Sequence, residues 1–214
     1  MTIERHGWLE VFAFEQEVLG WKGEDEERVL MVDFGGGRGH QCVRLRKKYP
    51  GLKGRVVLQD LEAVVAGLGS MEGVEIMAHN FLQLQPVKGQ FSLHLFWNVL
   101  QLLTEFLCVG AKFYYLRAVM HGYPDDKCVN ILKNMIPAMN KESKILLDDK
   151  VLPDRGVGWQ TCELDLVMMS CLGALERTNS QWTKLVESAG LRIEKVYLYS
   201  SLMNHSVIVV GLRD

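Results

Sequence analysis

The sequence predicts an α/β fold, a three-layer sandwich around a mostly parallel sheet that ends in an antiparallel strand. The first observation is a βαβ unit in the N-terminal third, where a strand, a glycine-rich turn, a helix and a second strand follow one another. The second is that strand-like apolar runs keep alternating with helical runs along the chain. The third is a pair of strands near the C-terminus, 191–199 and 206–212, whose short polar link implies an antiparallel hairpin.

The βαβ unit begins with an apolar run closed by glycines. Residues 29–39 read Val-Leu-Met-Val-Asp-Phe-Gly-Gly-Gly-Arg-Gly, a pattern typical of a buried parallel strand that runs into a tight turn. A helix is expected over 40–49, with its first N–H groups facing whatever lies over the turn. The second strand, 55–59, ends at Asp60, whose carboxylate can accept hydrogen bonds from both ribose hydroxyls of an adenosine. An equally good interpretation makes Asp60 the N-cap of a helix over 61–66.

The glycine spacing separates several classes of nucleotide-binding protein. Gly35, Gly37 and Gly39 form G-x-G-x-G, whereas a dinucleotide fingerprint requires G-x-G-x-x-G or a final Ala. A Lys followed by Ser or Thr is missing after the glycines, which excludes a Walker-type phosphate loop. The acidic Asp33, two places before this pattern, makes the turn resemble motif I of class I S-adenosylmethionine-dependent methyltransferases. A nicotinamide oxidoreductase is disfavoured, and a plain glycine turn remains an alternative.

A third strand over 74–78 leads into His79-Asn80-Phe81. Ligands of open α/β sheets lie beyond the C-terminal ends of the strands, so this tripeptide is expected near an adenine. Asn80 could accept a hydrogen bond from an exocyclic amine and Phe81 could pack on a ring face. The alternative for Phe81 is an ordinary core aromatic, the commoner fate of a lone Phe.

The other expected elements follow from hydrophobic periodicity and from the positions of proline and glycine. The helices are predicted over 8–19, 125–139, 160–172 and 181–189, and the strands over 112–119 and 143–147.

Composition limits the class of protein. Of the 214 residues, 48% are hydrophobic and 23% charged, which is ordinary for one globular domain. The net charge of −2 gives a nucleic-acid partner no electrostatic support. The five cysteines form no C-x-x-C and suggest reduced thiols, and the N-terminus carries no secretory signal. We expect a cytoplasmic protein with neither a nucleic-acid nor a membrane partner.

Several ordered blocks of the sequence carry a family resemblance. The blocks are Val-Asp-Phe-Gly-Gly-Gly-Arg-Gly-His (32–40), Lys-Gly-Arg-Val-Val-Leu-Gln-Asp-Leu (53–61), Phe-Tyr-Tyr-Leu-Arg-Ala-Val-Met-His (113–121), Pro-Asp-Asp-Lys-Cys (124–128), Val-Leu-Pro-Asp (151–154) and Ala-Leu-Glu-Arg-Thr (174–178). The resemblance is to the C-terminal catalytic domain of caffeic-acid-type plant and fungal O-methyltransferases, above all the fungal sterigmatocystin-like branch, and it covers nearly the whole chain. It implies a Rossmann-like class I methyltransferase fold, S-adenosyl-L-methionine as cofactor, and a small hydroxylated aromatic of secondary metabolism as substrate.

The resemblance also implies a role for particular residues. His121 would be the catalytic base, flanked by Asp149 and Glu176, and no metal is implied. The cofactor site would comprise Asp33, Gly35, Gly36, Gly37, Gly39, Asp60, Asn80, Phe81 and Arg117. A phenol of pKa ~10 is mostly protonated at neutral pH, and a neutral imidazole of pKa ~6.5 can take its proton as the oxygen attacks.

The chain departs from the family at three places. Gly122 follows His121 where the family usually has Asp, and Asn80 replaces a usual Asp. Residues 1–27 correspond only to the linking helix of an N-terminal dimerisation domain, through which the family forms homodimers; 28–214 would be the catalytic domain. Residues 90–110 are extra relative to the family. They could be a membrane span or a surface helix, but the preferred interpretation is a retained intron that is translated in frame. Excision would rejoin Gly89 to Ala111.

Two functional hypotheses follow. The leading one is an S-adenosylmethionine-dependent O-methyltransferase with His121 as general base. The alternative is a catalytically impaired, truncated remnant that binds only cofactor or a partner.

Overall fold

The computed structural model describes residues 7–18, 28–87 and 110–213. Within these ranges seven strands form one mixed sheet in the order β3-β2-β1-β4-β5-β7-β6. The strands are β1 (Val29–Phe34), β2 (Arg55–Asp60), β3 (Glu75–Ala78), β4 (Phe113–Arg117), β5 (Lys144–Lys150), β6 (Leu191–Ser200) and β7 (His205–Leu212). The helices are α1 (Trp8–Val11), α2 (Phe14–Val18), α3 (His40–Lys48), α4 (Glu62–Val65), α5 (Asp125–Met135), α6 (Trp159–Leu172) and α7 (Asn179–Ser188), with short 3-10 helices η2 (Met120–Gly122) and η3 (Ile136–Ala138). The predicted α/β fold class is confirmed.

The chain divides into two compact units, and β4 runs from one into the other. The glycine-loop unit comprises residues 22–114 and 134–144; the imidazole unit comprises 1–21, 115–133 and 145–214. No helix in the described ranges combines the length and apolar character that crossing a bilayer requires.

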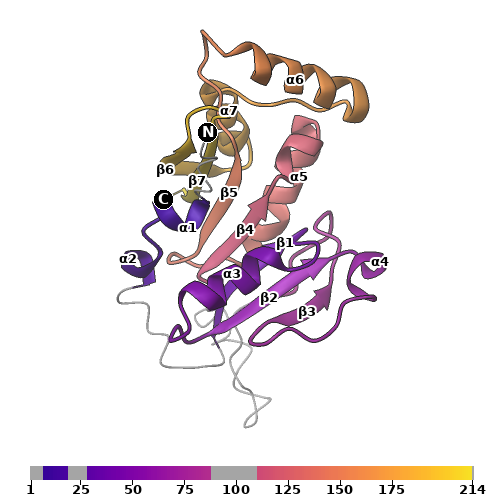
Figure 1. The fold of residues 1–214 in the computed structure, drawn as a ribbon, viewed down its shortest axis with the longest axis vertical. Coiled ribbons are helices and arrows are strands. Elements are labelled where there is room, and N and C mark those ends of the chain that lie inside the picture. The colour runs from indigo at the N-terminus through magenta and orange to yellow at the C-terminus, as the bar shows by residue number, and fades with distance from the viewer. Residues whose placement is uncertain (1–6, 19–27, 88–109, 214) are drawn as a thin grey trace, which may run out of the picture. The chain divides into compact units, whose positions relative to one another are not determined.

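In the glycine-loop unit, β1, β2 and β3 are parallel, so their C-terminal ends share one edge of the sheet. All six residues of β1 are buried, as a strand between two neighbours should be. Helix α3 lies against β2 (Figure 1) and buries Cys42 and Leu45. This arrangement is the predicted βαβ unit, with boundaries within one residue of those expected.

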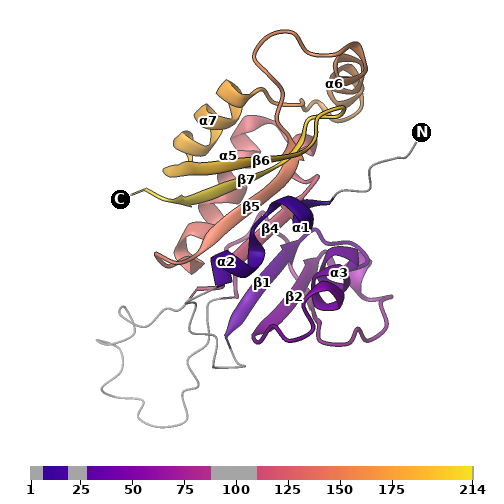
Figure 2. The same ribbon diagram turned by 60° about the vertical axis from the view of Figure 1, so that its left-hand side comes forward.

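In the imidazole unit, β7 pairs antiparallel with β5 on one side and with β6 on the other. Helix α7 lies along β6 (Figure 2), and a capping box begins it, because Thr178 and Gln181 exchange side-chain and backbone hydrogen bonds. The Trp182 indole N–H donates to the Lys150 carbonyl at 2.8 Å, which fixes α7 against the end of β5. The predicted C-terminal hairpin is confirmed.

The single helix predicted over 8–19 is wrong. The structure has α1 and α2 instead, separated at Phe12, whose backbone is extended. The break lets Phe12 and Phe14 both pack on the Trp8 ring, with centroids 6.0 and 6.1 Å away. Trp8 also stacks on Tyr115 at 4.5 Å, so aromatic burial outweighs helix continuity here.

Two further boundaries differ from the prediction. The strand expected over 143–147 continues as β5 to Lys150, so Asp148 and Asp149 lie inside a buried strand rather than after it. The helix expected over 125–139 stops at Met135, and Pro137 lies in the 3-10 turn that follows, because proline lacks the N–H of an α-helix interior. The predicted extra segment 90–110 and the linking residues 19–27 lie outside the described ranges, except for Gly110.

Candidate active site

The turn after β1 is built from backbone. Gly35, Gly37 and Gly39 have φ of 61°, 57° and 72°, the left-handed region that glycine enters without a side-chain clash. The N–H groups of Gly35 and Gly36 donate to the Gln59 carbonyl at 2.8 and 3.3 Å. A Cβ on Gly36 would lie 2.3 Å from Leu58 Cδ1 and 2.7 Å from Asp33 Oδ2. Glycine is therefore required by conformation at three of these positions and by close packing at Gly36.

Asp60 is joined to this turn. Its Oδ2 accepts from the Gly37 N–H at 2.8 Å and its Oδ1 from the Leu61 N–H at 2.7 Å. A carboxylate has about four acceptor positions, so two stay available for a pair of vicinal hydroxyls. The N-cap interpretation fails, because helix α4 is capped at Leu61 without a side-chain hydrogen bond.

Asp33 lies at the end of β1 and is buried with 1% exposure. The Cys42 thiol donates to its Oδ2 at 3.3 Å, and burial together with this carboxylate raises the pKa of that thiol. Cys42 is therefore an inert thiol that secures Asp33 under the turn.

Asn80 and Phe81 follow β3 at the same edge of the sheet. Asn80 Oδ1 accepts from the Leu82 N–H at 3.0 Å, a local turn that Asn commonly forms and that leaves one lone pair. Phe81 is half-buried rather than part of the core, so the core-aromatic alternative is wrong. The loop is secured below by Gln59 and Gln85, which exchange two amide hydrogen bonds of 3.0 and 2.8 Å.

In the imidazole unit, His121 lies on η2 beside two buried carboxylates. Its Nδ1 is 3.4 Å from Glu176 Oε1 and 3.7 Å from Asp149 Oδ1, and its backbone N–H donates to Asp149 Oδ2 at 3.3 Å. The exposed fraction of the imidazole is 22%, while that of each carboxylate is at most 4%. A proton on Nδ1 satisfies the carboxylates and leaves the lone pair of Nε2 for a ligand. The structure thus brings together the three residues that the resemblance implies.

The ionisable groups of this cluster shift one another's pKa values. The hydrogen bond that His121 donates to Glu176 raises the pKa of His121 above its ordinary 6.5, although burial lowers it. Burial raises the pKa of Asp149 to about 6, although His121 lowers it. Burial also disfavours ionised Glu176, yet the hydrogen bonds with His121 and Lys150 outweigh it and hold its pKa below the ordinary value.

Two basic residues of the cluster were missed by sequence reasoning. Lys150 Nζ makes a short ion pair with Glu176 Oε1. Arg177, whose side chain is fully buried, donates to the carbonyls of Met120 and Tyr123 at 2.9 and 2.8 Å, on either side of His121. Their partners lie far along the chain, Glu176 for Lys150 and Asp125 for Arg177, so no local sequence pattern points to them.

The candidate ligand atoms of His121, Asp149 and Glu176 lie within 4.8 Å of one another. The Lys150 ammonium already pairs with Glu176, so we do not assign these three residues as metal ligands. The expectation of no metal stays a prediction.

Arg117, predicted for the cofactor site, is the last residue of β4. Its Nε is 3.6 Å from Asp148 Oδ2 and its side chain is 42% exposed. Asp148 also accepts hydrogen bonds from the Tyr115 and Tyr199 hydroxyls, so it is a structural hub linking β4, β5 and β6. The cofactor role of Arg117 stays a prediction.

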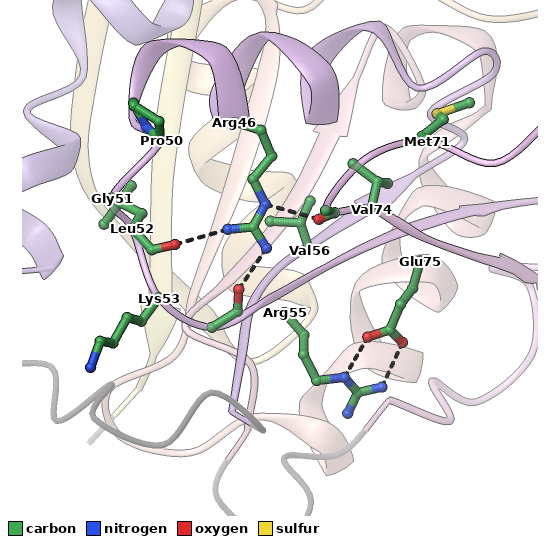
Figure 3. A pocket seen from close by; sticks show the side chains of 12 residues that line it. Arg46, Pro50, Gly51, Leu52, Lys53, Arg55, Val56, Met71, Val74 and Glu75 are labelled. Carbon is green, nitrogen blue, oxygen red and sulfur yellow. Dashed lines mark hydrogen bonds and ion pairs between the residues drawn. The ribbon is translucent and has the colours of Figure 1, made fainter.

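A surface hollow of about 580 Å³ lies in the glycine-loop unit where β2 and β3 begin (Figure 3). Arg46 spans it and donates to the carbonyls of Leu52, Gly54 and Gly73 at 2.9, 2.6 and 2.9 Å. Arg55 makes a bidentate pair with Glu75, both contacts being 2.6 Å. Both guanidinium groups therefore make structural contacts within the unit. None of the predicted site residues lines the hollow.

Comparison with known proteins agrees with this geometry. A family model described as an O-methyltransferase domain matches residues 102–192. Demethylsterigmatocystin 6-O-methyltransferase of Emericella nidulans is 39% identical over 205 residues, 95% of this chain and 88% of that protein. The chain spans about half the length of other curated relatives that it matches, for example 50% of the Aspergillus flavus enzyme of the same name at 40% identity.

Solved structures with a similar fold belong to related proteins. One entitled "A Pericyclic Reaction enzyme" has a TM-score of 0.84, and one of LepI in complex with S-adenosylmethionine has 0.83. Each is 38% identical, covering 100% of this chain and 50% of the other. With a sterigmatocystin-type relative matched along 88% of its length, this chain belongs to the O-methyltransferase family.

Proposed function

We propose that this chain is an S-adenosylmethionine-dependent O-methyltransferase that methylates a hydroxyl of a small aromatic secondary metabolite. The observation that carries the proposal is His121: Glu176 and Asp149 both face its Nδ1, so Nε2 is the nitrogen left to accept a proton. Family membership and the S-adenosylmethionine complex of the structural neighbour support the cofactor.

The residues of the glycine turn fit that cofactor. At Gly36 the turn lies so close to the strands that a Cβ would meet Leu58 and Asp33, and Asp60 keeps acceptor positions for two ribose hydroxyls. Phe81 offers a half-exposed ring, and Asn80 a carbonyl lone pair, for an adenine. When bound, the cofactor supplies an electrophilic methyl group on a positively charged sulfur.

In the proposed reaction His121 is the base, and the residues around it prepare its imidazole for that task. Its neutral Nε2 accepts the hydroxyl proton as the acceptor oxygen becomes nucleophilic, which raises the fraction of reactive oxygen near pH 7. Asp149 and Glu176 keep the proton of the neutral ring on Nδ1 and stabilise the imidazolium that forms. Arg177 holds the η2 carbonyls, so the imidazole keeps its direction while its charge changes.

The test is transfer of a deuterated methyl group from S-adenosylmethionine to a panel of phenols, followed by mass spectrometry. We expect a methylated product with the wild-type chain and a loss of about 10²–10⁴-fold with His121→Ala. Calorimetry should show unchanged cofactor affinity for His121→Ala, and no binding of NAD. Cofactor binding without transfer to any phenol would favour the remnant that binds only.

A second candidate comes from the neighbour whose title describes a pericyclic reaction enzyme. Membership of this family therefore does not by itself specify methyl transfer. The deuterated methyl separates the two: a rearranged product of unchanged mass would support the second candidate.

The remaining expectations are also proposals. A homodimer and the domain boundary at residue 28 rest on the resemblance alone. A cytoplasmic location stays a prediction from composition. Sedimentation of the chain measures the first of these directly.

A further inference from the structure

We propose that Lys150 is a positioning residue of the imidazole cluster: its ammonium shares Glu176 Oε1 with His121 Nδ1 and so sets the pH range in which His121 works. This inference rests on the proposed function of His121 as a base.

The first observation is the shared oxygen. Glu176 Oε1 is the atom contacted both by Lys150 Nζ and, at 3.4 Å, by His121 Nδ1. Glu176 Oε2 is buried and has no hydrogen-bond partner among the described residues. The ammonium and the imidazole therefore lie on the same carboxylate oxygen, which keeps the two groups close to each other.

The second observation is that Lys150 is held in place. Its side chain is 8% exposed, and its backbone carbonyl accepts from the Trp182 indole N–H at 2.8 Å. The backbone on the other side pairs with β7, opposite His205. A flexible surface lysine would exchange partners with water, whereas Lys150 is fixed from both sides.

The third observation is the charge of the cluster. Two carboxylates beside an imidazole would favour imidazolium, which cannot accept a proton. Lys150 opposes them, and its charge lowers the pKa of His121 while Glu176 and Asp149 raise it. With Lys150 present, an ammonium lies beside the two carboxylates, so the imidazole can lose its proton at a lower pH.

The surrounding charges do not replace Lys150. Arg177 is committed to Asp125 and to the η2 carbonyls, and Arg117 pairs with Asp148. Asp165 of α6 accepts from the Glu176 backbone N–H at 2.7 Å, which adds a further anion near the cluster. The groups around His121 are thus Glu176, Asp149, Lys150 and, behind them, Asp148, Asp165, Arg117, Arg177 and His205.

The test is the titration of His121 by ¹H–¹³C NMR of histidine rings in the whole 214-residue chain, with the resonance identified by its loss in His121→Ala. In Lys150→Met we expect the midpoint of the His121 titration to rise by about one pH unit. At a pH below that midpoint, the rate of any methyl transfer should be about tenfold lower than in the wild-type chain. Lys150→Arg keeps the charge and should keep the wild-type midpoint. Lys184→Met, which removes an exposed charge from α7, should also leave it unchanged.

An unchanged midpoint in a folded Lys150→Met chain, with only a lower melting temperature, would overturn the proposal in favour of a structural role. If Lys150→Met does not fold, the same question can be tested in the wild-type chain. The ¹⁵Nζ chemical shift of Lys150 should then change at the pH midpoint of His121, and a Lys150 chemical shift that stays constant through that midpoint would overturn the proposal. Absence of methyl transfer by the wild-type chain would contradict the proposed function, while the titration still decides the role of Lys150.

Discussion

The two turns that lead out of β1 and β4 are built in opposite ways. After β1, glycine occupies all three left-handed positions, and backbone N–H groups donate to Gln59 and Asp60. After β4, the left-handed residue is Ala118, with φ of 51°, and the chain then enters η2 with His121. That second turn has backbone hydrogen bonds too, for example from the Ala118 N–H to the Asp148 carbonyl at 3.0 Å, but it is also held by the side chains of Arg177 and Asp149.

The difference has a physical reason. A turn that has to approach a ligand with its backbone needs conformational freedom and no Cβ, so its requirement is local. A turn that has to aim one ionisable ring needs opposing charges at fixed distances, and these come from strands and loops far along the chain. The backbone conformation of the first turn depends on its own glycines, whereas the direction of the imidazole in the second depends on side chains from elsewhere in the chain.

The largest effect in this comparison is expected from a substitution in the glycine turn after β1. Gly36→Ala places a Cβ 2.3 Å from Leu58 Cδ1 and 2.7 Å from the Asp33 carboxylate. We expect a loss of cofactor affinity of at least about tenfold and of about 1–3 kcal/mol in the free energy of unfolding. Calorimetry and urea unfolding measure both.

Gly37→Ala is the matched control for that variant. Its φ of 57° makes alanine unfavourable, by about 1–2 kcal/mol. Nothing lies within 4 Å of the added Cβ, so the contacts that shape the turn remain. Equal losses of cofactor affinity in the two variants would show that close packing at Gly36 does not matter.

The second effect concerns pH and the imidazole cluster. The folded pKa of His121 is raised by Glu176, so its contribution to stability is present below its ordinary 6.5 and is lost as pH rises through the folded pKa. The rate of methyl transfer has the opposite pH dependence and increases as pH rises, because the neutral imidazole is the base. We expect the rate to fall about tenfold per pH unit below the folded pKa. Rate and urea-unfolding profiles from pH 5 to 9 measure this, and His121→Asn should remove the imidazole's part of the stability profile and leave that of Asp149, whose pKa is about 6.

The third effect tests whether the turn after β4 is strained. Ala118→Gly removes a left-handed alanine that costs about 1–2 kcal/mol, against about 0.5–1 kcal/mol of added chain entropy in the unfolded state. We expect a gain of up to about 1 kcal/mol in thermal or urea unfolding. Asn204→Gly at φ of 55° is the control and should gain less, since Asn tolerates this region. A destabilised Ala118→Gly chain would contradict the strain.

The smallest effect is expected from deleting residues 90–110. The Val87 carbonyl and the Ala111 N–H both contact the Tyr114 hydroxyl, at 3.3 and 3.2 Å, so Lys88 and Gly89 alone can join them. Gly110 packs against the Ala138 carbonyl, where a Cβ would lie at 2.5 Å, and in the shortened chain Gly89 takes this place. We expect unchanged cofactor affinity and no loss of stability; an unfolded product would contradict the retained-intron interpretation.

Periodicity and glycine spacing were enough to predict the sheet, the βαβ unit and the C-terminal hairpin, because those signals are local. The same reasoning could not separate two functions of Asp60, since only the fold shows that α4 is capped at Leu61. It missed Lys150 and Arg177, whose partners lie 26 and 52 residues away. The broken helix at Phe12 was missed for a similar reason, because its ring packs against Tyr197 at 5.7 Å.

The central claim is that the glycine turn seats the cofactor while His121 takes a proton from an acceptor hydroxyl. A crystal structure of the chain with S-adenosylhomocysteine and a methylated phenol tests it most directly. We predict Asp60 at the ribose hydroxyls and His121 Nε2 about 3 Å from the phenolic oxygen. A nucleoside bound away from Gly36 and Asp60, or an acceptor oxygen out of reach of His121, would contradict it.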